Sequence, residues 1–233
     1  MFHPVGHPLE RGWVGRVEDD RVIQLAAQTL QAFFTGGGTA REHAEYPLAE
    51  VRFLAPVLHP PAVRVFEDQV SFVFANPASV VGPDVVVRAP GPAEPLSVAS
   101  RVGAIVGADG AIGAYTVFAE WRDEARPAPK DRDFALGLGP VAVTADEFDP
   151  AAGVNIVRVD GEERARMSAP ELDWKAAIAL AAEGTRLYPG DVVAGPTGGV
   201  VGDIRAGAVV EVEVGGIGVL TQRVARRTAS ASS

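Results

Sequence analysis

Cysteine is absent from the sequence, and its absence excludes several kinds of chemistry. Without a thiol, the 233-residue chain forms no disulfide, no thiolate metal site and no cysteine nucleophile. Histidine is scarce too, and the four residues His3, His7, His43 and His59 show no metal-ligand spacing. Two of them lie near the N-terminus and His59 lies in a proline-rich connector, so we expect exposed side chains rather than a metal centre.

Clustered positive charge and long apolar runs are also lacking. The formal net charge is −9, whereas nucleic acids and anionic membranes bind clustered cations, so the composition predicts neither partner. No apolar run approaches the ~20 residues that a membrane span needs. The first residues lack the cationic start and the apolar centre of a signal peptide. Together these absences predict a cytoplasmic protein.

Helix signals are few, whereas glycine, proline and short valine-rich runs are frequent. This pattern predicts a mainly β fold with a few helices, of the α+β class. We expect three parts: a small N-terminal region over residues 1–60, a β domain over residues 61–224 and a flexible tail over residues 225–233. In the N-terminal region the sequence predicts a hairpin of Trp13–Val17 and Arg21–Leu25, a helix over Ala26–Phe34 and a weaker helix over Arg41–Glu50.

In the β domain, short apolar runs between turn residues predict a series of strands. The predicted strands are Val63–Phe66, Ser71–Phe74, Val85–Arg88, Ser97–Val106, Ala114–Trp121, Pro140–Thr144, Val154–Val159, Glu162–Met167, Val192–Ala194, Ala208–Val214 and Gly218–Val224. Asp160-Gly161 is a strong two-residue hairpin turn. The best helix runs over Pro170–Glu183, with Ser168 as its cap and Gly184 at its end.

Residues 129–150 read PKDRDFALGLGPVAVTADEFDP and stand out from the rest of the chain. Lys130, Asp131 and Asp133 precede a glycine-rich turn, and the valine run after the turn favours a buried strand. A charged cluster that leads into a core strand is one way to mount a functional site on a rigid scaffold. A solvated surface turn before a strand is the alternative interpretation.

The order of motifs from about Val51 to Val224 resembles the fumarylacetoacetate hydrolase family. The segments that carry the resemblance are VRFLAPVLHPP, NPASVVGP, RVGAIVG, Gly113–Arg126, PKDRDFALGLGPVAVTADEFDP, the Asp160-Gly161 hairpin, LYPGDVVAGPTGGVVG and VVEVEVGGIGVLTQRV. The most specific are LGP-x-x-VTADE and YPGD followed by GIG-x-L. The resemblance implies a mixed β-sandwich roll, usually dimeric, that follows a small N-terminal region.

The resemblance also implies a chemistry, which is metal-assisted cleavage or decarboxylation of oxo acids. In the family, a Glu-x-Glu pair and a later Asp bind magnesium or calcium, and the ion stabilises the enolate of a dicarbonyl or 2-oxo acid. A histidine activates water in the hydrolases, and a lysine helps to hold the negative charge. The implied ligand is therefore a small oxo acid or a β-dicarbonyl.

Matched onto this sequence, the Glu-x-Glu positions fall at Ala99 and Arg101, and the third carboxylate falls at Glu120. Arg101 would repel a divalent cation, so we expect no metal cofactor; magnesium is expected only if these positions are misaligned. The loop that carries the family's histidine is missing, since residues 66–69 run straight into the next strand. Lys130 and Asp133 keep the family's spacing to the LGP turn.

By resemblance, the candidate catalytic residues are Lys130, Glu120, Asp133 and Arg101. Lys130 and Arg101 would be electrophilic groups, and Glu120 or Asp133 would transfer the proton. Arg101 either takes the position of the metal and pairs with Glu120, or fills a dead site with a salt bridge. The candidate substrate-binding residues are Arg122, Gly195, Pro196 and Thr197, of which the last three stand where the family has Gly-Thr-Pro.

Two functions fit this pattern. The first is a divergent enzyme that acts on a small oxo acid or β-dicarbonyl by C–C bond hydrolysis, decarboxylation or enolate-type isomerisation, without the usual metal triad. The alternative is a non-catalytic binding or regulatory subunit of the same fold. Ordinary metal-dependent hydrolysis with ligands elsewhere is a third possibility. In each case we expect a homodimer or a heterodimer with a paralogue.

Overall fold

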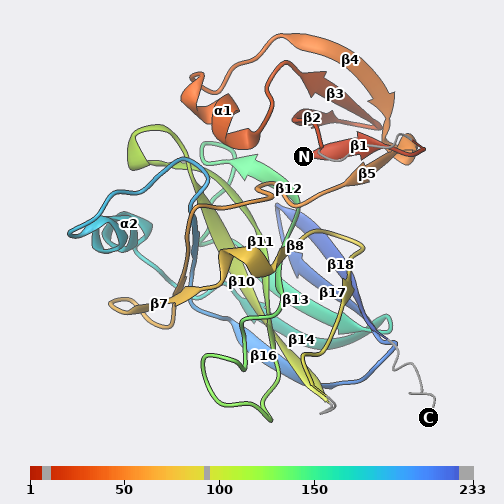
Figure 1. The fold of residues 1–233 in the computed structure, drawn as a ribbon, viewed down its shortest axis with the longest axis vertical. Coiled ribbons are helices and arrows are strands. Elements are labelled where there is room, and N and C mark those ends of the chain that lie inside the picture. The colour runs from red at the N-terminus through yellow and green to blue at the C-terminus, as the bar shows by residue number, and fades with distance from the viewer. Residues whose placement is uncertain (7–11, 92–94, 226–233) are drawn as a thin grey trace, which may run out of the picture.

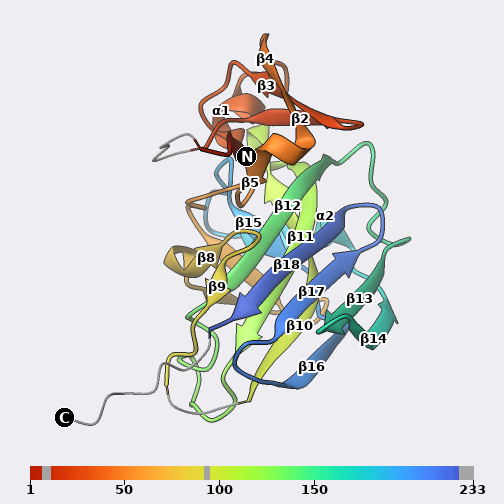
Figure 2. The same ribbon diagram turned by 90° about the vertical axis from the view of Figure 1, so that its right-hand side faces the viewer.

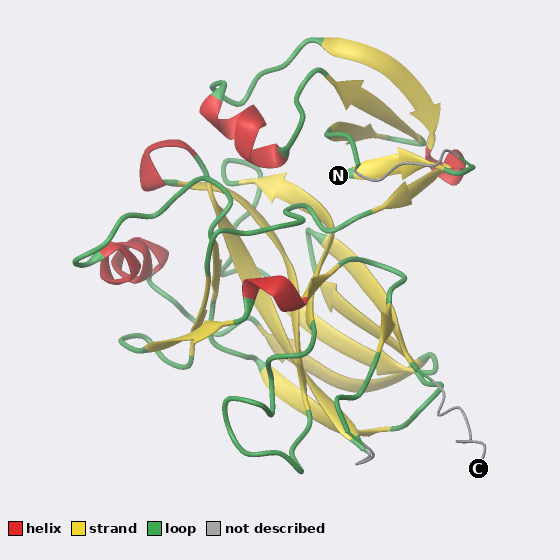
Figure 3. Cartoon of the chain, viewed as in Figure 1, coloured by secondary structure: helices red, strands yellow, loops and turns green. Residues whose placement is uncertain are grey.

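The structure is a computed structural model that describes residues 1–6, 12–91 and 95–225 (Figure 1). This part of the chain is mainly β (Figure 3) and has two α-helices, which confirms the predicted fold class. A small N-terminal region, at the top of Figure 1, lies against a larger body of strands. No helix of the described part is long and apolar enough to cross a membrane. His7 and the expected tail, apart from Ala225, lie outside the described residues.

A large sheet of eight strands forms the centre of the body. Its order is β7-β6-β15-β10-β11-β12-β8, and β16 pairs with β10 beside this path. The two longest strands, β10 and β11, are antiparallel and almost entirely buried, which explains their near-continuous apolar sequences. The strands are β6 (Val63–Phe66), β7 (Phe72–Ala75), β8 (Val80–Val81), β10 (Leu96–Val106), β11 (Ile112–Arg122), β12 (Leu136–Thr144), β15 (Val192–Ala194) and β16 (Gly199–Ile204).

A five-stranded sheet packs against the large sheet and completes a sandwich (Figure 2). Its order is β14-β13-β17-β18-β9. Trp121 of the large sheet and Leu220 of the smaller one belong to the shared core, where Trp121 Nε1 donates a hydrogen bond of 2.7 Å to Gln222 Oε1. The strands are β9 (Val86–Val87), β13 (Val154–Val159), β14 (Glu162–Ser168), β17 (Val209–Val214) and β18 (Gly218–Val224).

The N-terminal region contains two small sheets, one of β1 and β5 and one of β2, β3 and β4. Their bounds are β1 (Phe2–Pro4), β2 (Gly15–Glu18), β3 (Arg21–Leu25), β4 (Glu42–Pro47) and β5 (Val51–Phe53). The predicted hairpin is present as β2 and β3. The predicted helix is α1 (Leu30–Thr35), which begins late because Thr29 is its N-cap. Phe34 of α1 lies in a buried cluster with Val57 and Ile105, which joins the region to the body.

The predicted helix over Arg41–Glu50 is wrong. Glu42–Pro47 forms β4, which pairs along β3, and Leu48–Glu50 is a single 3-10 turn. In the strand, Tyr46 packs its ring against Phe2 with 5.6 Å between the ring centres. Pairing and packing in the folded protein therefore outweigh the weak local helix preference.

The other differences lie at the ends of elements. Helix α2 (Trp174–Ala182) begins after the predicted start, because Asp173 and not Ser168 is the N-cap and accepts a hydrogen bond of 3.0 Å from Ala176 N. Strand β12 starts at Leu136, before the predicted Pro140. Strand β16, which borders β10, is not among the predicted strands.

Asp160 and Gly161 form the two-residue turn between β13 and β14, as the sequence predicts. Their φ angles are 52° and 81°, and this left-handed conformation at both positions is what a type I′ turn requires. A methyl group added to Gly161 would meet no atom within 4 Å. Only the backbone conformation therefore resists a larger residue there.

Replacing Gly161 with alanine should lower the free energy of unfolding by about 1 kcal/mol, because a residue with a Cβ atom is strained in this conformation. Gly202 of β16 is the matched control, since it also has open space around an added methyl group but no left-handed φ. Urea unfolding of the two variants measures the difference. Equal stability of Gly161→Ala and Gly202→Ala would contradict the prediction.

Candidate active site

Arg101 of β10 and Glu120 of β11 meet on the face of the large sheet that points away from the sandwich core. Val102 lies in that core, and side chains alternate along a strand, so Arg101 points to the opposite face. The β10–β11 register sets Ala99 opposite Glu120, which makes Arg101 and Glu120 diagonal neighbours. Arg101 Nη2 lies 2.8 Å from Glu120 Oε2, and Arg101 Nε donates to the same oxygen at 3.0 Å. The pairing expected from the sequence is therefore present.

Arg101 is also held by the backbone. Its Nη1 donates to the carbonyl oxygen of Phe66 at 2.8 Å and to that of Gly195 at 2.9 Å. Phe66 ends β6, and Gly195 follows β15, which runs parallel to β6. The fully buried guanidinium therefore joins β6, β10, β11 and the chain after β15.

Three arginines surround the buried carboxylate of Glu120. Besides Arg101, Arg122 Nη2 donates to Glu120 Oε2 at 2.9 Å, and Arg132 Nη1 lies 3.4 Å from Glu120 Oε1. Arg122 and Arg132 are 18% and 26% exposed, so the network reaches from the buried interior to the surface.

Glu67 and Asp131 balance the remaining positive charge. Arg132 Nη1 lies 3.0 Å from Glu67 Oε1, and Arg132 Nε lies 3.0 Å from Asp131 Oδ2. Glu67 Oε2 also lies 3.7 Å from Arg101 Nη2. Arg101, Glu120, Arg132 and Glu67 therefore form a closed ring of alternating charges, and the whole network of three arginines and three carboxylates is neutral.

The network decides the protonation state of Glu120. Burial by itself would raise the pKa of this carboxyl group, but the charges and hydrogen bonds of Arg101 and Arg122 outweigh burial and hold the pKa below its ordinary value. Burial lowers the pKa of Arg101, against the opposing effect of Glu120 and Glu67. Because an arginine guanidinium keeps its proton in proteins, the pair is ionised.

Lys130 and Asp133 pair with each other rather than with Glu120. Lys130 Nζ lies 2.6 Å from Asp133 Oδ2, and the side chains are 62% and 28% exposed. The residues between them belong to the buried network, since Arg132 contacts Glu120 and Asp131 contacts Arg132. The segment that the sequence singled out therefore carries an accessible ion pair on the outside and an arginine of the network on the inside.

Of the three remaining predicted residues, Gly195 is the one that contacts Arg101. Besides bonding Arg101 through its carbonyl, Gly195 lines a small hollow together with Pro196. The hollow has about 10 Å³ of free space, about enough for one water molecule, and its other lining side chains include Leu172 and Trp174. Thr197 instead donates its hydroxyl to the Gly199 carbonyl oxygen at 2.7 Å.

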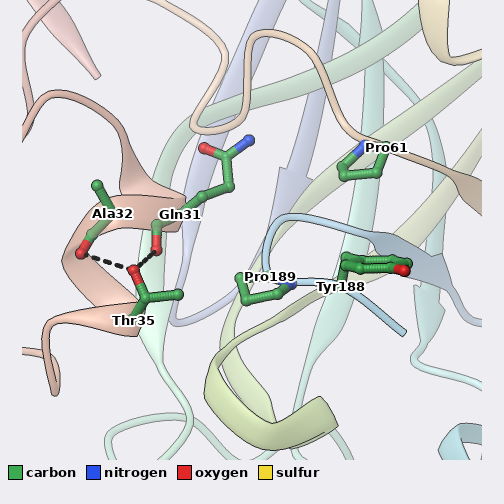
Figure 4. A pocket seen from close by; sticks show the side chains of 6 residues that line it. All are labelled: Gln31, Ala32, Thr35, Pro61, Tyr188 and Pro189. Carbon is green, nitrogen blue, oxygen red and sulfur yellow. Dashed lines mark hydrogen bonds between the residues drawn. The ribbon is translucent and has the colours of Figure 1, made fainter. Parts of the chain in front are cut away.

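A larger cavity of about 480 Å³ lies between helix α1 and the start of β15 (Figure 4). Its lining residues are Gln31, Ala32, Thr35, Pro61, Tyr188 and Pro189, none of them charged and none of them predicted from the sequence. Pro61 precedes β6 and Pro189 precedes β15, so this cavity lies at the opposite ends of the two parallel strands from Arg101. Tyr188 supplies the cavity's only titratable side chain, and the cavity does not contain the predicted site.

The residues at the family's metal positions do not fit a divalent cation. Ala99 offers no ligand atom, and Arg101 brings a positive charge that bonds the one remaining carboxylate, Glu120. Within the described part of the chain, no group of three or more His, Asp or Glu side chains could hold a metal ion. The side chains at these positions form a salt-bridge network instead of a metal site.

Sequence reasoning missed Glu67 and Arg132 as members of the site. Both stood in segments that had been noted, Arg132 inside PKDRD and Glu67 at the position of the missing histidine loop. The missing loop was the signal in the sequence that could have placed Glu67 in the site. Without that loop, Glu67 directly follows the end of β6.

Comparison with known proteins adds a family and a set of similar structures. Residues 49–225 match the family described as "Fumarylacetoacetate (FAA) hydrolase C-terminal", and residues 13–56 match "Rv2993c-like, N-terminal". Protein Rv2993c of Mycobacterium tuberculosis is 28% identical over 261 aligned positions, which cover 92% of this chain and 98% of that protein.

Solved structures share the fold. Maleylpyruvate hydrolase from Sphingobium sp. SYK-6 superposes with a TM-score of 0.79 at 22% identity, over 94% of this chain and 98% of that one. The same hydrolase has been solved with a manganese(II) ion and pyruvate. The 2-hydroxyhepta-2,4-diene-1,7-dioate isomerase of Mycobacterium marinum superposes with a TM-score of 0.76 at 24% identity, over 93% and 94% of the two chains.

Replacing Glu120 with glutamine should lower the free energy of unfolding by about 3–5 kcal/mol at neutral pH, because it leaves Arg101 buried without its main partner. The pKa of Glu120 is lowered in the folded protein, so its stabilising effect is complete above the unfolded-state pKa and is lost as pH falls through the folded-state pKa. The stability difference from wild type should therefore shrink on acidification. Urea unfolding from neutral to acidic pH measures it.

Glu163→Gln is the control, because Glu163 forms an exposed ion pair with Arg166 and should matter little at any pH. A difference between Glu120→Gln and wild type that stays constant down to strongly acidic pH would show that the charge of Glu120 is not the stabilising feature.

Proposed function

Since this chain belongs to the fumarylacetoacetate hydrolase family, we propose that it is a divergent enzyme of that family which acts on a small oxo acid or β-dicarbonyl without the usual metal triad. The reaction would be C–C bond hydrolysis, decarboxylation or enolate-type isomerisation. The observation that carries the proposal is the buried Arg101–Glu120 ion pair, because it supplies a fixed cation at a position where the family resemblance expects a metal ligand.

Arg101 would act on the substrate mainly through its charge. Its Nε and Nη1 groups are already bonded to Glu120 and to two carbonyl oxygens. A buried guanidinium still stabilises negative charge that develops nearby, since the surrounding protein screens it weakly. In this scheme Arg101 stabilises the negative charge of the enolate, as the metal ion does in the family.

Lys130 and Asp133 are the accessible pair that would meet the substrate. The ammonium group of Lys130 would hold the developing enolate oxygen, and the carboxylate of Asp133 would move the proton. Glu120, the other candidate for proton transfer, is a weaker base because its pKa is lowered and arginines occupy both of its oxygens. Arg122 and the chain over residues 195–197 would bind the substrate.

A non-catalytic binding or regulatory subunit is the second candidate. The observation that favours it is the loss of two metal-ligand positions to Ala99 and Arg101, while arginines hold the remaining carboxylate of Glu120. A homodimer or a heterodimer with a paralogue, and a cytoplasmic location, stay predictions.

Lys130→Ala should abolish turnover of the oxo acid substrate, because it removes the accessible cation that would hold the enolate oxygen. Turnover of a panel of acylpyruvates and 2-oxo acids, followed by loss of the substrate's ultraviolet absorbance, measures this. Lys175→Ala is the matched control: Lys175 is the chain's other lysine, is exposed on α2 and should be dispensable. Unchanged turnover in Lys130→Ala would remove Lys130 from the mechanism, and a wild-type protein that turns over nothing in the panel would favour the non-catalytic candidate.

Removing or adding divalent metal should leave both turnover and melting temperature unchanged, because a guanidinium and not an ion joins the strands at Arg101. The measurement compares protein treated with a chelator, untreated protein and protein with millimolar magnesium. Activity that is lost on chelation and restored by magnesium would instead support metal-dependent hydrolysis with ligands elsewhere.

A further inference from the structure

The turn between β6 and β7 covers the arginine network. It carries Glu67, whose carboxylate bridges Arg132 Nη1 at 3.0 Å and Arg101 Nη2 at 3.7 Å. Glu67 is 38% exposed, whereas Glu120 on the inner side of the same ring is 1% exposed. Glu67 is therefore the outermost carboxylate in contact with Arg101.

The same turn also contacts the segment that precedes α2. The Gln69 side chain donates to the carbonyl oxygen of Glu171 and accepts from Asp173 N at 3.3 Å. Leu172, between these two residues, lines the hollow. The turn therefore contacts both the network and the segment that precedes α2.

The turn is braced internally by the carboxylate of Asp68. Asp68 Oδ1 accepts hydrogen bonds from Val70 N at 2.8 Å, Ser71 N at 2.7 Å and Ser71 Oγ at 2.8 Å. These bonds do not involve the network or the hollow. Two sets of contacts hold this turn to the rest of the protein. Glu67 contacts Arg132 and Arg101, and Gln69 bonds the backbone of Glu171 and Asp173.

Arg101 Nη2 is one of three buried network atoms that lack a well-directed partner, together with Arg122 Nε and Asp131 Oδ1. Although it is close to Glu120 and Glu67, it makes no hydrogen bond of good geometry, and the side chain is fully buried. A buried donor without a directed acceptor is unfavourable, and a planar guanidinium is suited to binding a carboxylate. Of the three unpartnered atoms, Arg101 Nη2 is the one within 4 Å of Glu67, whose Oε2 lies 3.7 Å away.

We propose that Glu67 occupies the binding site of the ligand's carboxylate while the protein is free of ligand. An oxo acid then displaces Glu67 and binds Arg101 Nη2 and Arg132 Nη1. The exchange keeps the network neutral, since one carboxylate replaces another. It releases Glu67 into solvent, to which it is already partly exposed. The class of ligand rests on the proposed function, whereas the binding atoms and the internal competitor come from the geometry.

Removing the competitor should strengthen binding of the ligand. If Glu67 fills the site in most molecules, only the open fraction can bind the ligand. The apparent affinity is then the intrinsic affinity multiplied by that fraction. Glu67→Gln keeps the shape of the side chain but loses the charge that Arg101 and Arg132 attract. We expect it to bind oxalate, used as a small dicarboxylate probe, about tenfold or more tightly than wild type.

Calorimetric titration of oxalate into the full-length protein tests this. The control variant is Glu163→Gln, because Glu163 is 39% exposed and paired with Arg166, closely matching Glu67, but is remote in sequence and in its contacts. We expect its oxalate affinity to equal that of wild type. Adding Arg132→Ala to Glu67→Gln should abolish the gain. An affinity of Glu67→Gln within twofold of wild type, or a gain that survives Arg132→Ala, would overturn the proposal.

Glu67→Asp provides a second route if the glutamine variant fails to fold, as judged by circular dichroism. Its shorter carboxylate spans the two arginines less well, so oxalate binding should again become tighter, and unchanged binding would count against the proposal. The titration measures no turnover. Tighter oxalate binding by Glu67→Gln together with a wild type that transforms nothing in the panel would refute the enzymatic function alone, whereas an active wild type without the gain in affinity would refute the displacement alone.

Discussion

The Arg101–Glu120 ion pair is the interaction on which the site depends. Burying two charges is unfavourable unless their attraction and additional hydrogen bonds offset the loss of water. Here the guanidinium gains two backbone carbonyls, and the carboxylate gains contacts with Arg122 and Arg132. Because these partners come from separate strands and turns, the same contacts that make the pair tolerable also fix the relative positions of β6, β10, β11 and the chain after β15.

The site consequently divides into a buried framework and an accessible rim. In the framework, each arginine is paired with a carboxylate. These pairs hold the strands in place, and their groups are not free to react with a substrate. At the rim, Lys130 and Asp133 form an ion pair that water reaches, and Glu67 spans the two zones. Residues of the same short segment serve both zones, since Arg132 points inward between Asp131 and Asp133. Family resemblance treats this segment as one motif, but the folded protein gives its members different surroundings.

Much of this arrangement could be predicted from sequence, and the exceptions have physical causes. The apolar runs of β10 and β11, the Asp160-Gly161 turn and the family order are local patterns, and the Arg101–Glu120 pair follows from the pairing of two adjacent strands. Strand β4 was missed because its pairing with β3 outweighs its own weak preference. Glu67 was missed because its partner Arg132 lies 65 residues away, and no local pattern marks such a contact. The cavity beside α1 likewise depends on how the N-terminal region packs on the body.

The cation that joins the strands is a side chain, so the protein does not have to bind it from solution. A dissociable ion occupies its site according to its concentration and exchanges with competitors of similar size and charge. Arg101 is present once in every molecule from the moment of synthesis, and no competitor can replace it. Its occupancy is thus encoded in the gene, and natural selection can adjust it only by mutation, not through the cell's control of its metal pools.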